Sequence, residues 1–422
     1  MSNLNQQSKP QSFDVTIIGA GIVGVCCALS LIERGKTVHL IDKKGVAQET
    51  SYGNAGVISP WSVIPQSMPG MGLSAIKWMI DPLGPISIRP AYLPIFLPWA
   101  MRFLALSRVH KVEQCSAAMA DLMRNNIPLY RHHLSGTAHQ SLIRDSHFIA
   151  AYRDTRQINL DDLGSKLRTK IGAQIEQIDA SALRQLEPAL STQYQGAVVV
   201  RDQARTVSPA RLAITLADKA QANGAALTIA TVNKLAAQEN GEWQLQTSEG
   251  TLNAKAVVIA AGPWSATLLE PLGLKLPLAS ERGYHLEFAN PGVTLNNSIL
   301  DVTHKFVTSS MEGGIRSAGT AEFDRLDRPP NYQRAKMLEP LTRSMLPDLN
   351  TESAQQWMGI RPSFPDSLPC IDQMPGQQNL FLAFGHNHYG LGMAPQTGEW
   401  VADLVTGKAP SVDLSPYRAG RF

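Results

Sequence analysis

The chain has 422 residues, 44% of them hydrophobic, which is enough for two domains of ordinary size with buried cores. Its formal net charge is only +3 and it has no long basic run, which argues against a nucleic-acid partner. The four cysteines, Cys26, Cys27, Cys115 and Cys370, lack the spacing of metal ligands. We therefore expect buried thiols in a reducing compartment and no metal site.

The first predicted strand and helix come after a polar N-terminal segment. Residues 1–12 have no apolar stretch like that of a secretory signal, so they are expected to form a loose tail. Residues 13–18 (FDVTII) predict a buried strand, residues 22–35 a helix that ends at Gly35, and residues 36–42 (KTVHLID) a second strand. Together they predict a βαβ unit.

The turn between the first strand and the helix carries glycines spaced G-x-G-x-x-G, at Gly19, Gly21 and Gly24. In this pattern the first glycine permits a tight turn, the second lets the backbone approach a pyrophosphate, and the third lets the helix lie close to the strand. Asp42 ends the second strand 18 residues after Gly24, where an acid accepts hydrogen bonds from ribose hydroxyls. The segment predicts a dinucleotide site. By itself it does not distinguish NAD from FAD, but no second fingerprint of this kind follows.

The segment from Ala91 to Arg108 is apolar but interrupted by Pro94, Pro98 and Arg102. It is too short and too broken to span a bilayer, which needs about 20 apolar residues. Its aromatic content and basic end would suit a patch that lies at a membrane surface. An ordinary core or lid helix is the alternative interpretation.

The rest of the chain alternates between two kinds of segment. Residues 208–224 predict a helix with Ser208 as N-cap, and residues 226–230, 243–248 and 254–262 predict strands. Strands of a second, mostly antiparallel sheet are predicted at residues 147–154, 196–202, 281–289 and 313–323. The last block returns to a strand (NLFLAFG) and a helix (APQTGEWVADLVTG). We therefore expect a chain that leaves a nucleotide domain twice and returns twice.

Several motifs, in this order, resemble the FAD-dependent amine and amino-acid oxidoreductases, the superfamily of D-amino-acid oxidase, glycine oxidase and sarcosine oxidase. The motifs are VTIIGAGIVG, ETSYGNAGVIS, VVIAAGPWS, WMGIRPSFPDSLPCID and AFGHNHYGLGMAPQTG, and the likeness is strongest to the small-subunit type of bacterial D-amino-acid dehydrogenase. The resemblance implies an α/β fold in which a Rossmann-like, glutathione-reductase-type FAD domain is interleaved with a mostly antiparallel α+β substrate domain. The FAD domain would comprise residues 12–60, 203–265 and 356–422, and the substrate domain residues 61–202 and 266–355.

The cofactor implied by the resemblance is non-covalent FAD, because no cysteine convincingly matches a flavin-linked position and Cys370 only comes nearest. A helix that begins near residues 391–395 would point its positive end toward the flavin N1 and O2. The residues expected to hold the cofactor are Gly19, Ala20, Gly21, Ile22, Val23, Gly24, Asp42, Lys43, Ser51, Asn54, Ala55, Gly56, Val232, Ala261, Gly262, Trp264, Gly385, His386, Gly390, Leu391, Gly392 and Met393.

The substrate anchor is expected to be Arg361, whose guanidinium offers a planar fork that matches a carboxylate. The resemblance agrees, because the amino-acid oxidases place their carboxylate-binding arginine in a matching G-x-R-P segment; an ion pair of Arg361 with Asp366 or another acid is the alternative. Tyr284 would be a second contact, or half-buried packing, and His388 and Tyr389 would border the substrate. The implied reaction moves the α-hydrogen of a neutral amine to flavin N5 as hydride, and no residue is assigned as an obligatory general base.

Three functions remain open. The first is an amino-acid dehydrogenase, with a D-amino acid favoured, that passes electrons to a quinone or carrier protein. It would be cytoplasmic, with a peripheral membrane contact on the inner face through residues 91–108. The second is a soluble, oxygen-using oxidase of glycine or a secondary amine, although no lysine stands in a motif that matches the oxygen-activating lysine of some amine oxidases. The third is a non-catalytic FAD-binding subunit.

Overall fold

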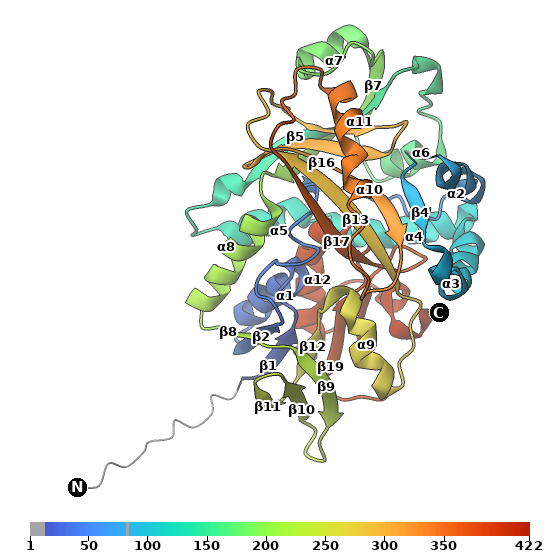
Figure 1. The fold of residues 1–422 in the computed structure, drawn as a ribbon. Helices are drawn as coiled ribbons and strands as arrows, with labels where there is room; N and C mark the ends of the chain where they lie inside the picture. The colour runs from blue at the N-terminus through green and yellow to red at the C-terminus, as the bar shows by residue number, and fades with distance from the viewer. Residues whose placement is uncertain (1–12, 82–83) are drawn as a thin grey trace.

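The computed structural model describes residues 13–81 and 84–422, so the expected N-terminal tail lies outside the described residues. The first sheet has the strand order β18-β19-β12-β1-β2-β8 and is parallel except for the edge strand β18. Figure 1 shows it in the lower half of the molecule. Its strands are β1 (Val15–Ile18), β2 (Val38–Asp42), β8 (Ala226–Ile229), β12 (Val257–Ile259), β18 (Cys370–Gln373) and β19 (Leu380–Phe384).

Three helices predicted from the sequence belong to the same half of the molecule as this sheet: α1 (Ile22–Glu33), α8 (Pro209–Ala222) and α12 (Gly390–Val405). The predicted signals of α8 are present, because the Ser208 side chain accepts a hydrogen bond from the Arg211 amide and Gly224 follows with φ +95°. Helices α1 and α12 pack against each other closely; a Cβ on Gly398 would lie 2.7 Å from the carbonyl oxygen of Cys26. Their apolar faces form the main core of this half of the molecule.

A small antiparallel sheet lies at the end of the parallel sheet, at the bottom of Figure 1. It consists of β9 (Val232–Ala237), β10 (Trp243–Thr247) and β11 (Gly250–Ala254), so the strand predicted at residues 243–248 belongs here. The buried Trp243 donates from Nε1 to the carbonyl oxygen of Gln378, 2.9 Å away, which fixes this sheet to the turn before β19.

The second large sheet has ten strands in the main order β17-β13-β16-β15-β14-β5-β7-β3, with β4 beside β16 and β6 beside β7. It is mostly antiparallel, with parallel pairs at β14 and β5 and at β16 and β4, and it contains all four strands predicted for it. The strands are β3 (Val57–Ile58), β4 (Ile86–Ile88), β5 (Ile143–Tyr152), β6 (Ile175–Asp179), β7 (Gly196–Thr206), β13 (Ala279–Phe288), β14 (Ser298–Asp301), β15 (Phe306–Met311), β16 (Gly314–Phe323) and β17 (Ala354–Ser363). This arrangement confirms the predicted α/β architecture of a parallel sheet with a second, mostly antiparallel sheet.

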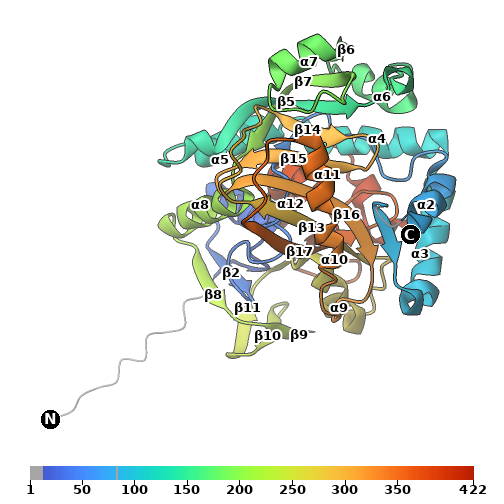
Figure 2. The ribbon, with the colours of Figure 1, turned by 45° about the horizontal axis from the view of Figure 1, so that its top comes forward.

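One face of the ten-stranded sheet is covered by α10 (Gln333–Lys336) and α11 (Leu338–Met345), which lie in front of β13, β16 and β17 in Figures 1 and 2. The core under these helices contains Tyr284, Leu286 and Phe288 of β13. Strand β3 and most of β17 pair into this sheet although they fall within the segments 12–60 and 356–422 expected for the FAD domain. The domain boundaries themselves stay a prediction.

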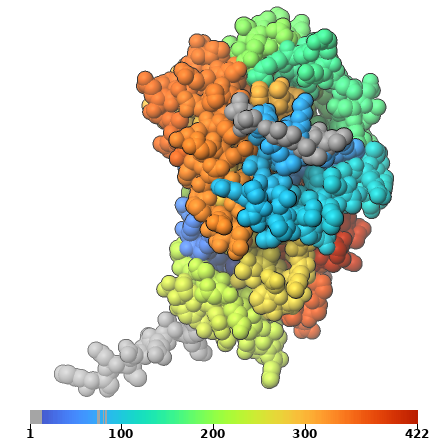
Figure 3. Space-filling model, turned by 45° about the vertical axis from the view of Figure 1, so that its right-hand side comes forward, coloured from blue at the N-terminus to red at the C-terminus, as the bar shows by residue number. Residues whose placement is uncertain are grey.

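The remaining α-helices are α2 (Met71–Ile80), α3 (Leu93–Leu106), α4 (Val109–Met123), α5 (Asn126–Leu134), α6 (Leu163–Lys170), α7 (Ala180–Leu186) and α9 (Ser265–Leu269). Of these, α4 and α5 pack against α12 and α9 packs against β9, so these three belong to the half with the parallel sheet. The segment 91–108 forms α3, whose Phe96 and Trp99 are buried against Phe323 of β16. Figure 3 shows the blue-to-cyan α2 and α3 region on the surface, between the orange α10 and α11 region and the red C-terminal segment. Among the described residues, no helix is long and apolar enough to cross a bilayer.

Candidate functional site

A cavity of about 1440 Å³ lies where the two large sheets meet. The loops after β1, β2, β8, β12 and β19 reach it from the carboxyl ends of the parallel strands, and β13, β16 and β17 reach it from the other side. The carboxyl ends of parallel strands are the usual place for a ligand in such a sheet. The volume exceeds the roughly 300 to 1,000 Å³ of ordinary ligand pockets, so a dinucleotide and a second molecule can share it.

Most of the residues expected to hold a cofactor line this cavity. Those that line it are Gly19, Gly21, Ile22, Val23, Asp42, Lys43, Ser51, Asn54, Ala55, Val232, Ala261, Gly262, Trp264, Gly385, His386, Gly390, Leu391 and Gly392. The other four, Ala20, Gly24, Gly56 and Met393, lie behind its wall.

The glycine-rich turn has the tight geometry that the sequence predicts. Gly19 has φ +111°, and a Cβ there would overlap the carbonyl oxygen of Ala260. A Cβ on Gly24 would overlap the carbonyl oxygen of Gly19, so the start of α1 can lie this close to β1 only with glycine. The turn leaves the first amides of α1 at the cavity, although the hydroxyl of Ser51 accepts from the amide of Ile22 at 3.0 Å.

Asp42 and Lys43 hold fixed positions at the end of β2. One carboxylate oxygen of Asp42 accepts from the amide of Ala20 at 2.9 Å, and the other accepts from the amides that follow Lys43. A carboxylate has about four acceptor positions, so Asp42 keeps capacity for ribose hydroxyls. The ammonium of Lys43 lies 3.1 Å from the ring centroid of Trp264, and this pair closes one side of the cavity.

The N-terminus of α12 supplies a second set of amides to the cavity. Tyr389 is its N-cap residue and makes no side-chain cap, so the first amides of the helix face the lining with the positive end of the helix dipole. A Cβ on Gly392 would lie 2.8 Å from the sulfur of Met123, and Tyr130 donates to the carbonyl oxygen of Leu391 at 2.6 Å. These contacts with α4 and α5 fix the start of the helix, which begins at Gly390, one residue before the predicted range.

His386 is buried beside this helix, and its Nε2 lies 3.0 Å from the hydroxyl of Thr397. Burial lowers the pKa of His386 to about 3, so its ring is neutral at physiological pH. The phenol of Tyr389 donates to the carbonyl oxygen of Ile64 at 2.7 Å, and burial raises its pKa to about 12. Both residues line the cavity, and these hydrogen bonds to Thr397 and Ile64 fix their side chains.

Arg361 lies on the cavity face of β17, directly opposite Glu281 of β13. Its Nη1 donates to the Oε1 atom of Glu281 at 2.8 Å and to the carbonyl oxygen of Thr320 at 3.1 Å. A Cβ on Gly283 would overlap Nη2, so the guanidinium lies flat over this glycine. In the described part of the chain the guanidinium donates only through Nη1, and Nε and Nη2 therefore keep donors for a ligand.

Glu281 connects three side chains in the cavity wall. Its Oε1 atom also meets Nε2 of His388 at 2.5 Å, and its Oε2 atom accepts from the hydroxyl of Ser363 at 2.7 Å. Burial alone would raise the pKa of Glu281, but the neighbouring His388 and Arg361 outweigh it and hold the pKa at about 2. The pKa of His388 is lowered, first by burial and also by the charge of Arg361. The group is therefore an ionised glutamate between an arginine and a histidine.

Tyr284 also lines the cavity, but its hydroxyl is not bonded to this group. The side chain lies in the core under α10 and α11, where its hydroxyl donates to Glu322 at 2.5 Å and accepts from the amide of Asn331 at 3.0 Å. Burial raises its pKa to about 12. The structure thus brings together Arg361 and His388 but not the Tyr284 hydroxyl.

The sequence analysis missed Glu281, Gly283 and Ser363. A glutamate in an otherwise strand-like segment, two residues before a glycine, was the available signal for Glu281. The alternative interpretation of Arg361, an ion pair with an acid, is present in the structure: the partner is Glu281 at 2.8 Å and not Asp366, which pairs with Arg421 at 2.7 Å.

The wall formed by α2 and α3 is apolar. It contributes Met71, Trp78, Phe96, Leu97, Phe103 and Leu104 to the lining. Trp99 connects α3 to the end of β17, because its Nε1 donates to the carbonyl oxygen of Ser363 at 2.9 Å. Leu93, Leu97 and Leu104 are more than half exposed although they line the cavity, so α3 borders its open side. Ile95 and Met101, which do not line it, are equally exposed on the outer surface of the helix.

A glycine-rich turn, two helix N-termini and a large cavity at the carboxyl ends of parallel strands define a dinucleotide-binding enzyme fold. A family model described as "FAD dependent oxidoreductase" (DAO) matches residues 14–404. The chain belongs to this family, and it is an FAD-dependent oxidoreductase.

Similar proteins cover the whole length of the chain. A protein named D-amino-acid oxidase from Bradyrhizobium diazoefficiens is 37% identical over 420 residues, covering 98% of this chain and 100% of its own. A protein named D-amino acid dehydrogenase from Allorhizobium ampelinum is 29% identical over 431 residues, covering 96% of this chain and 99% of its own. The solved structure of glycine oxidase from Geobacillus kaustophilus has the same fold, with a TM-score of 0.75 at 24% identity and coverage of 97% and 99% of the two chains.

Proposed function

We propose that this protein oxidises a small amino acid, a D-amino acid by preference, with non-covalently bound FAD. The observation that carries the proposal is Arg361, whose guanidinium lies in the cavity wall with Nε and Nη2 still available. The relatives named D-amino-acid oxidase and D-amino acid dehydrogenase support the substrate class. None of the four cysteines lines the cavity and all are buried, which supports a non-covalent cofactor.

The cavity fits FAD in three respects. The amides at the start of α1 would carry the pyrophosphate, and Asp42 would accept from the adenosine ribose. The start of α12 would face the flavin region that becomes negative on reduction. FAD held there would supply a two-electron acceptor for the α-hydrogen of the substrate, transferred as hydride, and the imine product would hydrolyse to a 2-oxo acid and ammonia.

Arg361 and Glu281 together form a pair that matches a zwitterion. The unused edge of the guanidinium would bind the α-carboxylate in a charge-assisted hydrogen bond. Glu281 already occupies Nη1, so its negative charge lies next to the bound carboxylate, at the place where an α-ammonium group would neutralise it. The pair therefore favours a substrate with both charges over a simple carboxylic acid.

His388 would take the proton that the ammonium must lose before hydride transfer. Glu281 holds one ring nitrogen, Nε2, and the residue lines the cavity, so Nδ1 of the neutral ring can accept a proton from the substrate. Burial lowers the pKa of His388, and the neighbouring Glu281 opposes this shift, so a cation formed on the ring would be stabilised by Glu281. Gly283 and the flat guanidinium would then fix the orientation of the Cα–H bond.

The electron acceptor is proposed to be a quinone or another lipophilic carrier at the α2 and α3 wall. This wall is apolar on the cavity side, and its outer surface exposes Ile95 and Met101 at 58% each, beside Arg102 and Arg108. Exposed apolar side chains next to basic ones suit contact with an anionic bilayer surface. The 37% identity to a relative named D-amino-acid oxidase favours oxygen as the second candidate acceptor.

The proposal is tested by turnover of a D- and L-amino-acid panel with a dye acceptor, run beside a peroxide assay. Dye reduction without peroxide supports the dehydrogenase, and stoichiometric peroxide supports the oxidase. If neither assay responds while FAD is bound, the protein is a non-catalytic FAD-binding subunit and the proposal is refuted.

A further inference from the structure

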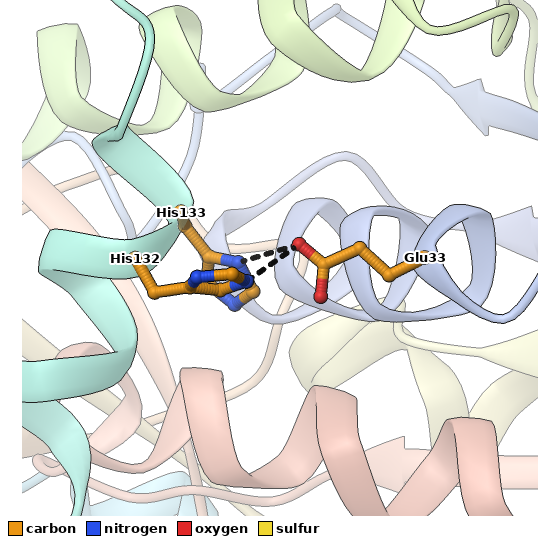
Figure 4. A group of neighbouring side chains, drawn as sticks. All are labelled: Glu33, His132 and His133. Carbon is orange, nitrogen blue, oxygen red and sulfur yellow. Dashed lines mark hydrogen bonds and ion pairs between the residues drawn. The ribbon is translucent and has the colours of Figure 1, made fainter.

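A second cluster of chemically reactive side chains lies away from the cavity. Glu33, the last residue of α1, meets His132 and His133 of α5, as Figure 4 shows. None of the three lines the cavity. Glu33 lies at the end of α1 opposite the glycine-rich turn, roughly 18 Å away for a helix of 12 residues at 1.5 Å per residue.

His133 is the unusual member of the cluster. Its side chain is fully buried, and neither ring nitrogen has a hydrogen-bond partner among the described residues. Its Nδ1 atom points toward the Oε1 atom of Glu33 but stops 3.8 Å away, beyond hydrogen-bond distance. Buried polar atoms without a partner are rare in folded proteins and call for an explanation, such as an ion that belongs at the position.

The distances in the cluster fit a tetrahedral metal ion. Two ligand atoms held about 2.0 to 2.1 Å from such an ion lie roughly 3.3 Å apart. The Oε1 atom of Glu33 lies 3.0 Å from Nε2 of His132 and 3.8 Å from Nδ1 of His133, which are distances on either side of that value. All three ligand atoms lie within 4.8 Å of one another. Small side-chain rotations would therefore place them around one ion.

The surroundings also suit an ion that arrives from solvent. The side chains of His132 and Glu33 are 58% and 38% exposed, so the position is accessible, while His133 closes it from behind. The ammonium of Lys219 donates to the carbonyl oxygens of His133 and Ser135, which fixes the end of α5 that carries both histidines.

We propose that Glu33, His132 and His133 form a binding site for a divalent transition-metal ion, with Zn²⁺ as the best match. Two imidazoles and one carboxylate are a ligand set that Zn²⁺ accepts, with water in the fourth position. The ion connects α1 with α5. Through Tyr130 on α5, which holds the start of α12, it braces both helices whose N-termini reach the cavity. The site is structural and takes no part in the redox step.

The test is a calorimetric titration of the metal-free, FAD-loaded protein with Zn²⁺ alone. The metal content of the protein is then measured after dialysis. One ion should bind per chain, and the melting temperature should rise with it. Glu33→Gln and His132→Ala should each weaken binding at least about 10-fold, since loss of even an outer partner of a metal ligand costs 10- to 100-fold. The control His110→Ala removes an exposed histidine of α4 outside the cluster and should bind as the unaltered protein does.

Both altered residues are exposed, so the variants are expected to fold, and an unchanged flavin spectrum checks this. Absence of stoichiometric binding at micromolar Zn²⁺ would overturn the inference. Equal affinity in Glu33→Gln, His132→Ala and the control would overturn it too, because the ion would then bind elsewhere. Neither result depends on the substrate or the acceptor of the enzyme.

Discussion

Glu281 offers the sharpest prediction, because its ionised carboxylate is fully buried between Arg361, His388 and Ser363. The substitution Glu281→Gln keeps the shape and one acceptor oxygen but removes the charge. The folded-state pKa of Glu281 is about 2, against an ordinary value of 4.5. A carboxyl whose pKa is depressed on folding stabilises the protein above its unfolded-state pKa, and this stability is lost as the pH falls through the folded-state value.

The pKa difference sets the magnitude. At 1.36 kcal/mol for each pH unit, the charge contributes about 3 kcal/mol to the free energy of unfolding at pH 7. The same linkage leaves roughly half of this contribution at pH 3, where the unfolded carboxyl is protonated and the folded one still mostly ionised. Glu281→Gln should therefore destabilise the protein clearly at pH 7 and about half as much at pH 3.

The assay is urea-induced unfolding of the two proteins at pH 7, 4.5 and 3, with flavin content recorded at each pH. Glu239→Gln, in the exposed turn between β9 and β10, is the matched control and should change little at any pH. A destabilisation by Glu281→Gln that is the same at pH 7 and pH 3 would show that charge pairing does not hold this wall together.

Three other substitutions test neighbouring parts of the account. Gly283→Ala places a methyl group on the guanidinium of Arg361, so kcat/KM should fall at least about 10-fold while FAD stays bound; unchanged kinetics would refute the packing argument. Gly24→Ala would overlap the carbonyl oxygen of Gly19, so the purified protein should lose FAD, and a normal flavin content by absorbance would contradict this. Ile95→Glu on the exposed face of α3 should reduce sedimentation with anionic vesicles and quinone reduction but leave dye reduction intact, and equal loss of both activities would count against a separate acceptor surface.

Local sequence patterns predicted much of the fold and the tight geometry of the glycine-rich turn. The glycine-rich turn depends on Gly19 and Gly24, and helix α8 on the cap at Ser208, so each can be read from residues close together in the chain. The parallel and the antiparallel character of the two sheets could also be predicted, because buried parallel strands and half-buried antiparallel strands differ in their apolar pattern.

The active-site wall could not be predicted in the same way. Glu281 and Arg361 are 80 residues apart and meet only because β13 and β17 pair in one register. Tyr284 lies in the predicted strand and lines the cavity, but its hydroxyl is bonded to Glu322 and Asn331, partners that its position in the sequence does not indicate. The cluster of Glu33 with two histidines likewise depends on how α5 packs against α1.

The central claim is tested most directly by anaerobic reduction of the bound flavin with D-amino acids in the unaltered protein and in Arg361→Ala. Loss of charge-assisted hydrogen bonds worth about 1.5 to 3 kcal/mol should raise the substrate concentration needed for half-maximal bleaching about 10- to 150-fold. Flavin content should stay normal, because Arg361 is not among the residues that would hold the cofactor. Bleaching of both proteins at the same substrate concentration would contradict the account.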